Sequence, residues 1–332
     1  MALPDWARAH GPSLFSAAIR VQASDFDVTE ELGFDFTGDG EHDYLFIEKT
    51  AANTEWLSRQ LAQFAQVPAR DIGYAGLKDR HAVTRQWFSV PRWNSPEWQQ
   101  LEVDGVRVLD QQRHNRKLRR GAHKANRFHL VLRGELPRKD ALDERLATIR
   151  AQGVPNYFGE QRFGRGGSNV ALAGAWSQGR RLPRHKRSIA ISAARSYLFN
   201  QILDARVRDQ SWNRLVSGDV ANLDGSGSVF RVNEVDEDLL RRCDELDVHP
   251  AGPLCGDGSS LEDVSEEQAS WLQALRDARV KPGTRSFRLR VADLECSRDT
   301  DSLILEFALT RGAYATAVLR EIADVHDESR RA

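Results

Sequence analysis

The stretch YLFIEKTAANTEWLSRQLAQFAQVP, residues 44–68, decides the fold class because it joins a predicted strand to a predicted helix. Residues 44–49 are apolar and β-prone, which indicates a strand. Asn53 and Thr54 are residue types that cap helices, and apolar residues then recur at helical spacing. Pro68 marks the end of this helix.

Strand patterns lie on both sides of this strand and helix. Residues 19–28 precede them, and residues 84–90 and 127–133 follow them. Strands interrupted by single helices, without a repeating strand–helix unit, predict an α+β sheet domain rather than a doubly wound one. The sequence contains no GxGxxG and no P-loop motif, which argues against a bound nucleotide cofactor.

Helical patterns dominate the chain from about residue 154 onward. The predicted helices are residues 170–178, 189–208 and 265–278, and a strand and a short helix follow at 303–309 and 315–323. The economical interpretation is a sheet domain that is split in sequence. Its last strand and helix would return after a mostly helical insertion.

The composition is that of a soluble globular protein, with 40% apolar and 29% charged residues. No apolar run approaches the roughly 20 residues that cross a bilayer, and the first 20 residues lack the pattern of a signal peptide. Three cysteines without a CxxC pair suit neither a disulfide framework nor a zinc site. We therefore expect reduced thiols in a cytoplasmic protein without a membrane partner.

The net charge of −1 conceals a strong separation of charges along the chain. Residues 113–124 contain six Lys or Arg and no acid, and residues 180–187 contain five and no acid. Acidic residues collect at 25–43 and 234–247. Such a pattern predicts a basic face for a polyanion, while the alternative is two solvated loops.

The segment Gly73–Trp87, GYAGLKDRHAVTRQW, has the strongest chemical character. Its Asp79 stands between Lys78 and Arg80, and neighbouring cations favour the ionised form of a carboxyl group. An ionised carboxylate can act as a nucleophile or as a base. From the residues alone, a solvated turn is the stronger interpretation of this Asp.

The Gly73–Trp87 segment resembles the active-site motif of the TruD family of tRNA pseudouridine synthases. Four further segments are similar to the same family and occur in the expected order: NRF at 126–128, PNYFGEQRFG at 155–164, ARSYLFN at 194–200, and RGAYAT at 311–316 with LRE at 319–321. Ordered matches to all five segments cover most of the chain. One match alone would be weak evidence.

This resemblance implies a fold, an activity and a partner. The implied fold is α+β, with a mixed, mainly antiparallel sheet domain at residues 1–153 plus 304–332 and a mostly helical insertion at 154–303. The implied activity is isomerisation of uridine, at position 13 of tRNA, to pseudouridine. It implies tRNA as the partner, no obligate protein partner, and no metal or organic cofactor.

The resemblance also assigns residues to the reaction. The family's catalytic aspartate falls on Asp79, and its Asn and Phe near the active site fall on Asn126 and Phe128. Other pseudouridine synthases place a tyrosine against the target base, where this family has phenylalanine. Phe128 would stack on the extruded base, although core packing is the alternative for an aromatic residue on a strand. The amide of Asn126 would hold the uracil edge or orient Asp79, unless it is a turn residue.

Other residues are candidates for contacts with the substrate. Lys78 and Arg80 would keep Asp79 ionised or hold phosphates. Phe158 and Arg162 lie in a segment rich in aromatic residues and glycine at the proposed domain junction, where we expect either substrate contacts or a hinge packed by its own side chains.

The residues leave the chemical route and three rival functions open. Asp79 would attack C1′ of the ribose or C6 of the uracil, or abstract the 2′ proton in a glycal route. The first rival is a non-catalytic RNA-binding protein or RNA chaperone. The second is the same chemistry on another RNA. The third, a hydrolase using His81 or Cys255, lacks a nucleophile–base pattern.

Overall fold

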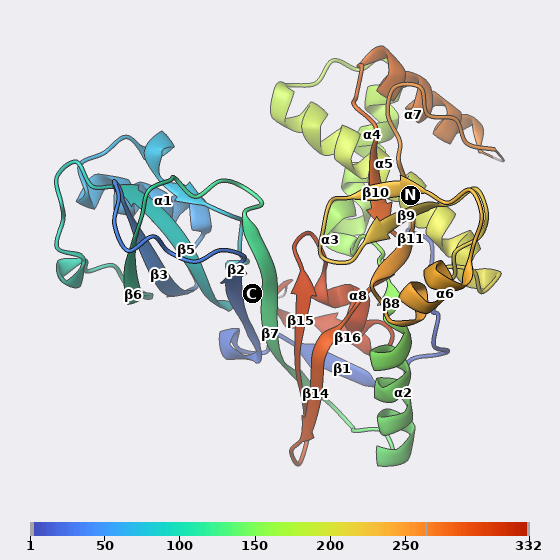
Figure 1. The fold of residues 1–332 in the computed structure, drawn as a ribbon, viewed down its shortest axis with the longest axis horizontal. Helices are drawn as coiled ribbons and strands as arrows, with labels where there is room; N and C mark the ends of the chain where they lie inside the picture. Colours follow the sequence, from blue (N-terminus) through green and yellow to red (C-terminus); the bar gives the residue numbers. More distant parts are fainter. Residues whose placement is uncertain (1–2, 263, 331–332) are drawn as a thin grey trace. The chain divides into compact units, whose positions relative to one another are not determined.

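The computed structural model describes residues 3–262 and 264–330, and these divide into two compact units (Figure 1). We call residues 14–142, 291–312 and 323–330 the sheet unit, and residues 3–13, 143–290 and 313–322 the helical unit. The sequence-based domain limits at 153/154 and 303/304 stay a prediction.

The sheet unit is built on one mixed, mainly antiparallel sheet with the order β14-β15-β7-β2-β5-β3-β6. Among the described strands of this sheet, β2 with β5 and β1 with β16 pair in parallel, and the other pairs are antiparallel. Short β4 pairs with β5, and β1 pairs with β7. The strands are β1 Ser16–Ile19, β2 Phe26–Leu32, β3 His42–Thr50, β4 Gly73–Tyr74, β5 Val83–Pro91, β6 Val106–His114, β7 His123–Arg133, β14 Ala292–Arg298, β15 Ser302–Thr310 and β16 Asp324–Asp327.

Helix α1 (Thr54–Phe64) confirms the prediction from residues 44–68. The side chain of Asn53 accepts hydrogen bonds from the first helical amides, as expected of an N-cap. Leu57 and Leu61 are fully buried and pack with Leu45 and Ile47 of β3. The predicted amphipathic face therefore covers one face of the sheet.

The predicted strand over residues 19–28 is wrong in its middle. β1 ends at Ile19, Arg20 adopts a left-handed backbone with φ 55°, and a short 3-10 helix spans Ala23–Asp25 before β2 begins. The buried carboxylate of Asp25 accepts from the amide of Gln22 and from the guanidinium of Arg133. These bonds stabilise a turn where the apolar pattern alone favours a continuous strand.

The helical unit packs around the long helix α5, which extends over Arg184–Arg208. The other helices are α2 Lys139–Gln152, which begins in the sheet unit, α3 Glu160–Phe163, α4 Ser168–Ser177, α6 Glu237–Asp244, α7 Glu266–Asp277 and α8 Ala315–Leu319. Buried Leu198, Phe199 and Leu203 of α5 belong to the same apolar core as Trp271 of α7. The predicted helices are therefore present, although α5 begins five residues earlier than its apolar periodicity suggests.

Strands within the helical unit were not predicted. An antiparallel sheet has the order β10-β9-β11-β12, and β8 pairs with β13. The strands are β8 Val154–Pro155, β9 Val220–Leu223, β10 Val229–Arg231, β11 Val248–Leu254, β12 Gly283–Ser286 and β13 Arg288–Leu289. Most have four residues or fewer, which is too short for an alternating pattern to be recognised. Among the described residues, no helix combines the length and apolar character needed to span a membrane.

Candidate active site

Asp79 lies in the loop of residues 75–82, between β4 and β5 of the sheet unit. One carboxylate oxygen accepts from the backbone amide of His81 at 3.0 Å, and the other lies 3.0 Å from a guanidinium nitrogen of Arg20. The Asp79 side chain is still 29% exposed. The carboxylate is therefore held in place from within the protein and accessible from outside it.

Arg20 is fixed more firmly than the carboxylate it contacts. Its side chain is 5% exposed, its guanidinium also pairs with Asp327 of β16, and it lies 3.8 Å above the centre of the Phe26 ring. A left-handed backbone is unfavourable for residues other than glycine, and such conformations cluster at functional sites. The turn at residues 20–25 thus presents Arg20 to Asp79.

The loop that carries Asp79 covers a polar part of an otherwise apolar sheet face. Register places Lys49, Thr84, Val28, Phe128 and Phe307 side by side across β3, β5, β2, β7 and β15. Directly paired residues point to the same face of a sheet. The face thus changes from amine and hydroxyl groups to apolar and aromatic groups along one row.

A second row on the same face carries three polar side chains. Glu30 of β2 pairs with Asn126 of β7, and Asn126 pairs with Leu309 of β15. In β5, Gln86 pairs with Ile47 of β3 and lies two residues beyond Thr84, so it shares this face. The amide of Gln86 donates to the carbonyl of Gly76 at 3.2 Å and joins the loop to the sheet.

Two buried charged side chains of the sheet, Glu30 and Lys49, hold the loop against the sheet. Glu30 and Lys78 form an ion pair at 2.7 Å, with side-chain exposures of 0% and 6%. The ammonium group of Lys49, which is fully buried, donates to the backbone carbonyl of Asp79 at 3.1 Å and to that of Ala52 at 2.7 Å. The cation that forms an ion pair with the Asp79 carboxylate is Arg20, while Lys78 pairs with Glu30.

Burial shifts the protonation of two groups on this face. It lowers the pKa of Lys49 to about 8, although the negative charge of Asp79 acts in the opposite direction. Burial, with the charge of Lys78, also lowers the pKa of His123. This shift favours the neutral form of the His123 side chain.

Asn126 and Phe128 occupy neighbouring positions on this face. Phe128 is 7% exposed and packs against Phe26 and, in a stacked arrangement, against Phe307 at 5.3 Å between ring centres. The side-chain oxygen of Asn126 is buried and accepts no hydrogen bond from the described part of the chain. Arg80 is exposed and donates to the carbonyl of Ala51.

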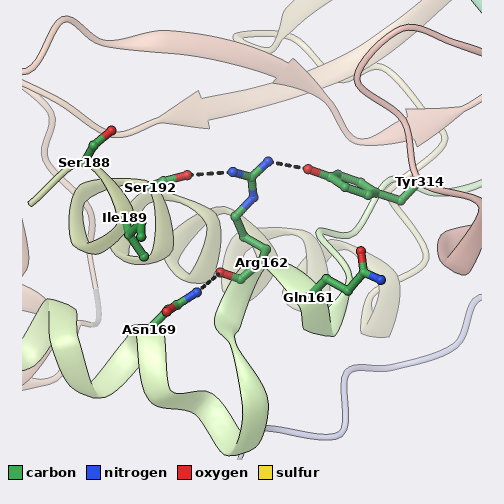
Figure 2. Close-up of a pocket in the computed structure, with 7 residues that line it drawn as sticks. All are labelled: Gln161, Arg162, Asn169, Ser188, Ile189, Ser192 and Tyr314. Carbon is green, nitrogen blue, oxygen red and sulfur yellow. Dashed lines mark hydrogen bonds between the residues drawn. The ribbon is translucent and has the colours of Figure 1, made fainter. Parts of the chain in front are cut away.

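Phe158 and Arg162 lie in the helical unit, so the structure does not place them relative to Asp79. Phe158 is 8% exposed, and its backbone amide and carbonyl both bond to the side chain of Asn200. Arg162 lines an open pocket of about 390 Å³ (Figure 2). It donates to Ser192 at 2.8 Å and to the hydroxyl of Tyr314.

Arg20, Glu30 and Lys49 were missed by the sequence reasoning. Glu30 and Lys49 had a readable signal, because each continues an apolar alternation: Phe26, Val28, Glu30 in β2 and Leu45, Ile47, Lys49 in β3. A charged residue in such an inward series is a candidate for a buried ionic role. No local pattern marks Arg20. Within residues 3–262 and 264–330, no group of His, Cys, Asp and Glu side chains is arranged to hold a metal ion.

Comparisons with known proteins identify the class to which this fold and loop belong. The sequence matches the model of the family described as tRNA pseudouridine synthase D (TruD) over residues 14–177 and 171–322. A solved structure described as a putative tRNA pseudouridine synthase D (TruD) from Methanosarcina mazei superposes with a TM-score of 0.73. The superposition covers 98% of this chain and 99% of that one at 20% identity, which shows a shared fold.

Curated relatives are similar over nearly their whole length. A protein named tRNA pseudouridine synthase D from Methylococcus capsulatus is 47% identical over 334 residues, which is 96% of this chain and 94% of the relative. A protein of the same name from Nitrosococcus oceani is 46% identical, over 94% of this chain and 91% of the relative. This chain belongs to the tRNA pseudouridine synthase D family.

Proposed function

We propose that this protein isomerises a uridine of tRNA to pseudouridine, at position 13, with Asp79 as the catalytic carboxylate. One observation carries the proposal. In a chain of this family, Asp79 is held by Arg20 and by the amide of His81 while part of its surface stays exposed. A nucleophile or base must be both oriented and accessible to the reacting atom.

The chemistry of the reaction accounts for the surroundings of Asp79. Pseudouridine formation breaks the bond between N1 and C1′, rotates the uracil and rejoins it through C5. A stacked base cannot rotate, so the nucleotide is first extruded at a cost of a few kcal/mol. Asp79 then attacks C1′ or C6, or removes the 2′ proton, and each route requires an ionised carboxylate. Arg20 places a positive charge 3.0 Å from the Asp79 carboxylate.

The sheet face beside the loop supplies candidate contacts for the base. Phe128 offers an aromatic surface, and stacking on such a ring is worth about 1–3 kcal/mol per base. The buried side-chain oxygen of Asn126 accepts no hydrogen bond within the described chain. Leaving a buried polar atom without a hydrogen bond destabilises a protein by roughly 1–3 kcal/mol. A uracil N–H would satisfy it. Exposed Arg80 is suited to a phosphate contact.

The remaining candidates have different roles in the proposal. Lys78 acts through Glu30 as an anchor of the loop rather than as a ligand of phosphate. Phe158 and Arg162 supply contacts from the helical unit. Position 13 rests on the family resemblance, because nothing in the geometry of the loop selects one uridine of a tRNA.

The test is tritium release from tRNA that carries [5-³H]uridine, with mapping of the modified position. Asp79→Asn preserves shape and removes the charge, so we expect no release with tRNA binding retained. Asp71→Asn, the same change at a nearby acid outside the loop, is the matched control and should behave like the wild type. Pseudouridine at a position other than 13 would refute that part of the proposal.

RNA binding without catalysis is the second candidate function, and the same test distinguishes it. Tight tRNA binding by the wild type without tritium release would favour it. Equal release by the wild type and by Asp79→Asn would move the catalytic role to another residue.

A further inference from the structure

The pocket at Arg162 belongs entirely to the helical unit and is lined mostly by uncharged polar groups. Arg162 comes from α3, Ser188, Ile189 and Ser192 come from α5, and Tyr314 precedes α8 (Figure 2). Gln161 and Asn169 complete the lining. Arg162 is the only charged residue among these seven, and no lining residue is an acid.

The guanidinium of Arg162 has a charge without an acidic partner in the described chain. Its two terminal nitrogens donate to the hydroxyl oxygens of Ser192 and Tyr314, and Nε is buried without a hydrogen-bond partner there. A buried or half-buried guanidinium is normally paired with an anion. The anion expected at this position is therefore missing from the protein itself.

The hydroxyl groups of Ser192 and Tyr314 offer hydrogen-bond donors beside the Arg162 guanidinium. Each oxygen accepts from Arg162, and within the described residues neither hydroxyl donates a hydrogen bond. A hydroxyl group that accepts from a cation still has its proton to donate. Ser192 and Tyr314 thus present O–H groups next to a positive charge, the arrangement that binds phosphate oxygens.

The electrostatic surroundings also favour an anion. Arg285, whose pKa burial lowers to about 10, lies close enough to Arg162 for the two charges to repel, and both guanidinium groups lie beside the Phe158 ring. All side chains of residues 184–189, which form the start of α5, are exposed, and they include Arg184, Lys186 and Arg187. The amide end of a helix adds further positive potential.

We propose that this pocket binds a phosphodiester group of the RNA substrate, with Arg162 as its charged ligand and Ser192 and Tyr314 as hydroxyl donors. This inference rests on the proposed function for the identity of the RNA. The exposed apolar side chain of Ile189 and the ring of Tyr314, which both line the pocket, favour a nucleotide within a chain over a free inorganic anion.

The test measures tRNA affinity of the full-length protein as a function of salt concentration. Each phosphate contact contributes about 0.7–0.9 to the slope of log K against log salt. We expect Arg162→Gln to weaken binding about tenfold and to lower the slope by that amount. Tyr314→Phe keeps the charge, so we expect a weakening of roughly threefold with an unchanged slope.

Arg241→Gln is the matched control, because it removes the same charge at a residue already paired with Asp238 and Glu245. It should bind tRNA as the wild type does. Unchanged affinity and slope in folded Arg162→Gln would overturn the inference. If that variant does not fold, unchanged affinity in both Tyr314→Phe and Ser192→Ala would overturn it. Competition by millimolar inorganic phosphate as strong as that by tRNA would show an adventitious anion site instead.

Tritium release by the wild type separates this inference from the proposed function. Release by the wild type together with normal binding by Arg162→Gln refutes the phosphate pocket alone. Absence of release, with binding that depends on Arg162, refutes the catalytic proposal and supports the pocket.

Discussion

At the scale of single residues, the charges beneath the loop explain how a carboxylate is held in a segment without regular structure. Lys49 donates to the backbone of Asp79, and Glu30 holds the ammonium group of the preceding residue. Lys49 and Glu30 lie on one face of the sheet, so their contacts fix residues 78 and 79 to a rigid scaffold. Loops positioned in this way by a scaffold are common sites of catalysis.

The pKa of Lys49 predicts a specific pH dependence of stability. It is about 8 in the folded protein and near 10.5 when the chain is unfolded, so between these values the unfolded state binds more protons. The contribution of Lys49 to the free energy of unfolding is therefore most unfavourable below about pH 8 and improves as the pH rises toward 10.5. Between about pH 7.5 and 9.5 this gain is roughly 2 kcal/mol.

Urea unfolding at the two pH values, compared between the wild type and Lys49→Met, measures this contribution. We expect the variant to lack the gain. Lys139→Met, the same change at an exposed lysine, is the control and should keep the wild-type dependence. Identical pH dependence in all three proteins would contradict burial of a titrating amine at residue 49.

The sequence made Asp79 recognisable and left its nearest charged partner unidentified, and the reason is physical. Asp79 lies in a contiguous motif, whereas Arg20 lies much earlier in the sequence, directly after β1, and meets Asp79 only in the folded chain. The contact depends on the left-handed backbone of Arg20, which an apolar periodicity does not encode. Adjacent cations in sequence suggested Lys78 and Arg80 instead.

At the scale of elements, the start of α1 is coupled to the loop of residues 75–82 that carries Asp79. The Asn53 side chain caps the helix, and the hydroxyl of Thr54 accepts from the backbone amide of Lys78 at 3.0 Å. The same hydroxyl donates to Gln86 of β5 at 3.0 Å. The helix N-terminus, the loop and the central strand thus share one hydrogen-bonded junction.

This junction predicts that loss of the helix cap affects the reaction as well as stability. Asn53→Ala should lower the free energy of unfolding by about 1 kcal/mol, and fraying of α1 should release the loop and slow tritium release. Asp236→Ala removes the equivalent cap of α6 in the helical unit and is the control. It should cost similar stability without slowing the reaction at saturating tRNA. Equal effects of both variants on the rate would argue against the coupling.

The elements that the sequence predicted are those with long, uninterrupted periodicity. β3, β5, β15, α1, α4 and α7 fall close to their expected limits, whereas β7 begins at His123, before the predicted start at residue 127. The early start of α5 was missed because residues 184–188 carry charged and polar side chains on every side, so no apolar stripe marks them. The strands of the helical unit were missed because they are short, and their pairing is decided by tertiary contacts.

At the scale of the whole molecule, the basic run at 180–187 opposes the stability of its own unit. Arg184, Lys186 and Arg187 occupy the first turn of α5, which contains no acidic residue. The N-terminus of a helix carries partial positive charge, so each cation there is unfavourable by about 0.3–1 kcal/mol. We therefore expect these three charges to serve an anionic ligand, which the tRNA of the proposed function would supply.

The last prediction follows from this opposition between stability and binding. Replacement of Arg184, Lys186 and Arg187 by Gln should raise the melting temperature and weaken tRNA binding, with a loss of up to about 2–3 in the salt slope. The control replaces Arg241 and Arg242 by Gln in the last turn of α6, where cations favour the helix. That change should lower the melting temperature and leave tRNA binding unchanged. If the α5 variant is less stable, or binds tRNA with the wild-type slope, the basic run is a solvated turn and the phosphates are bound elsewhere.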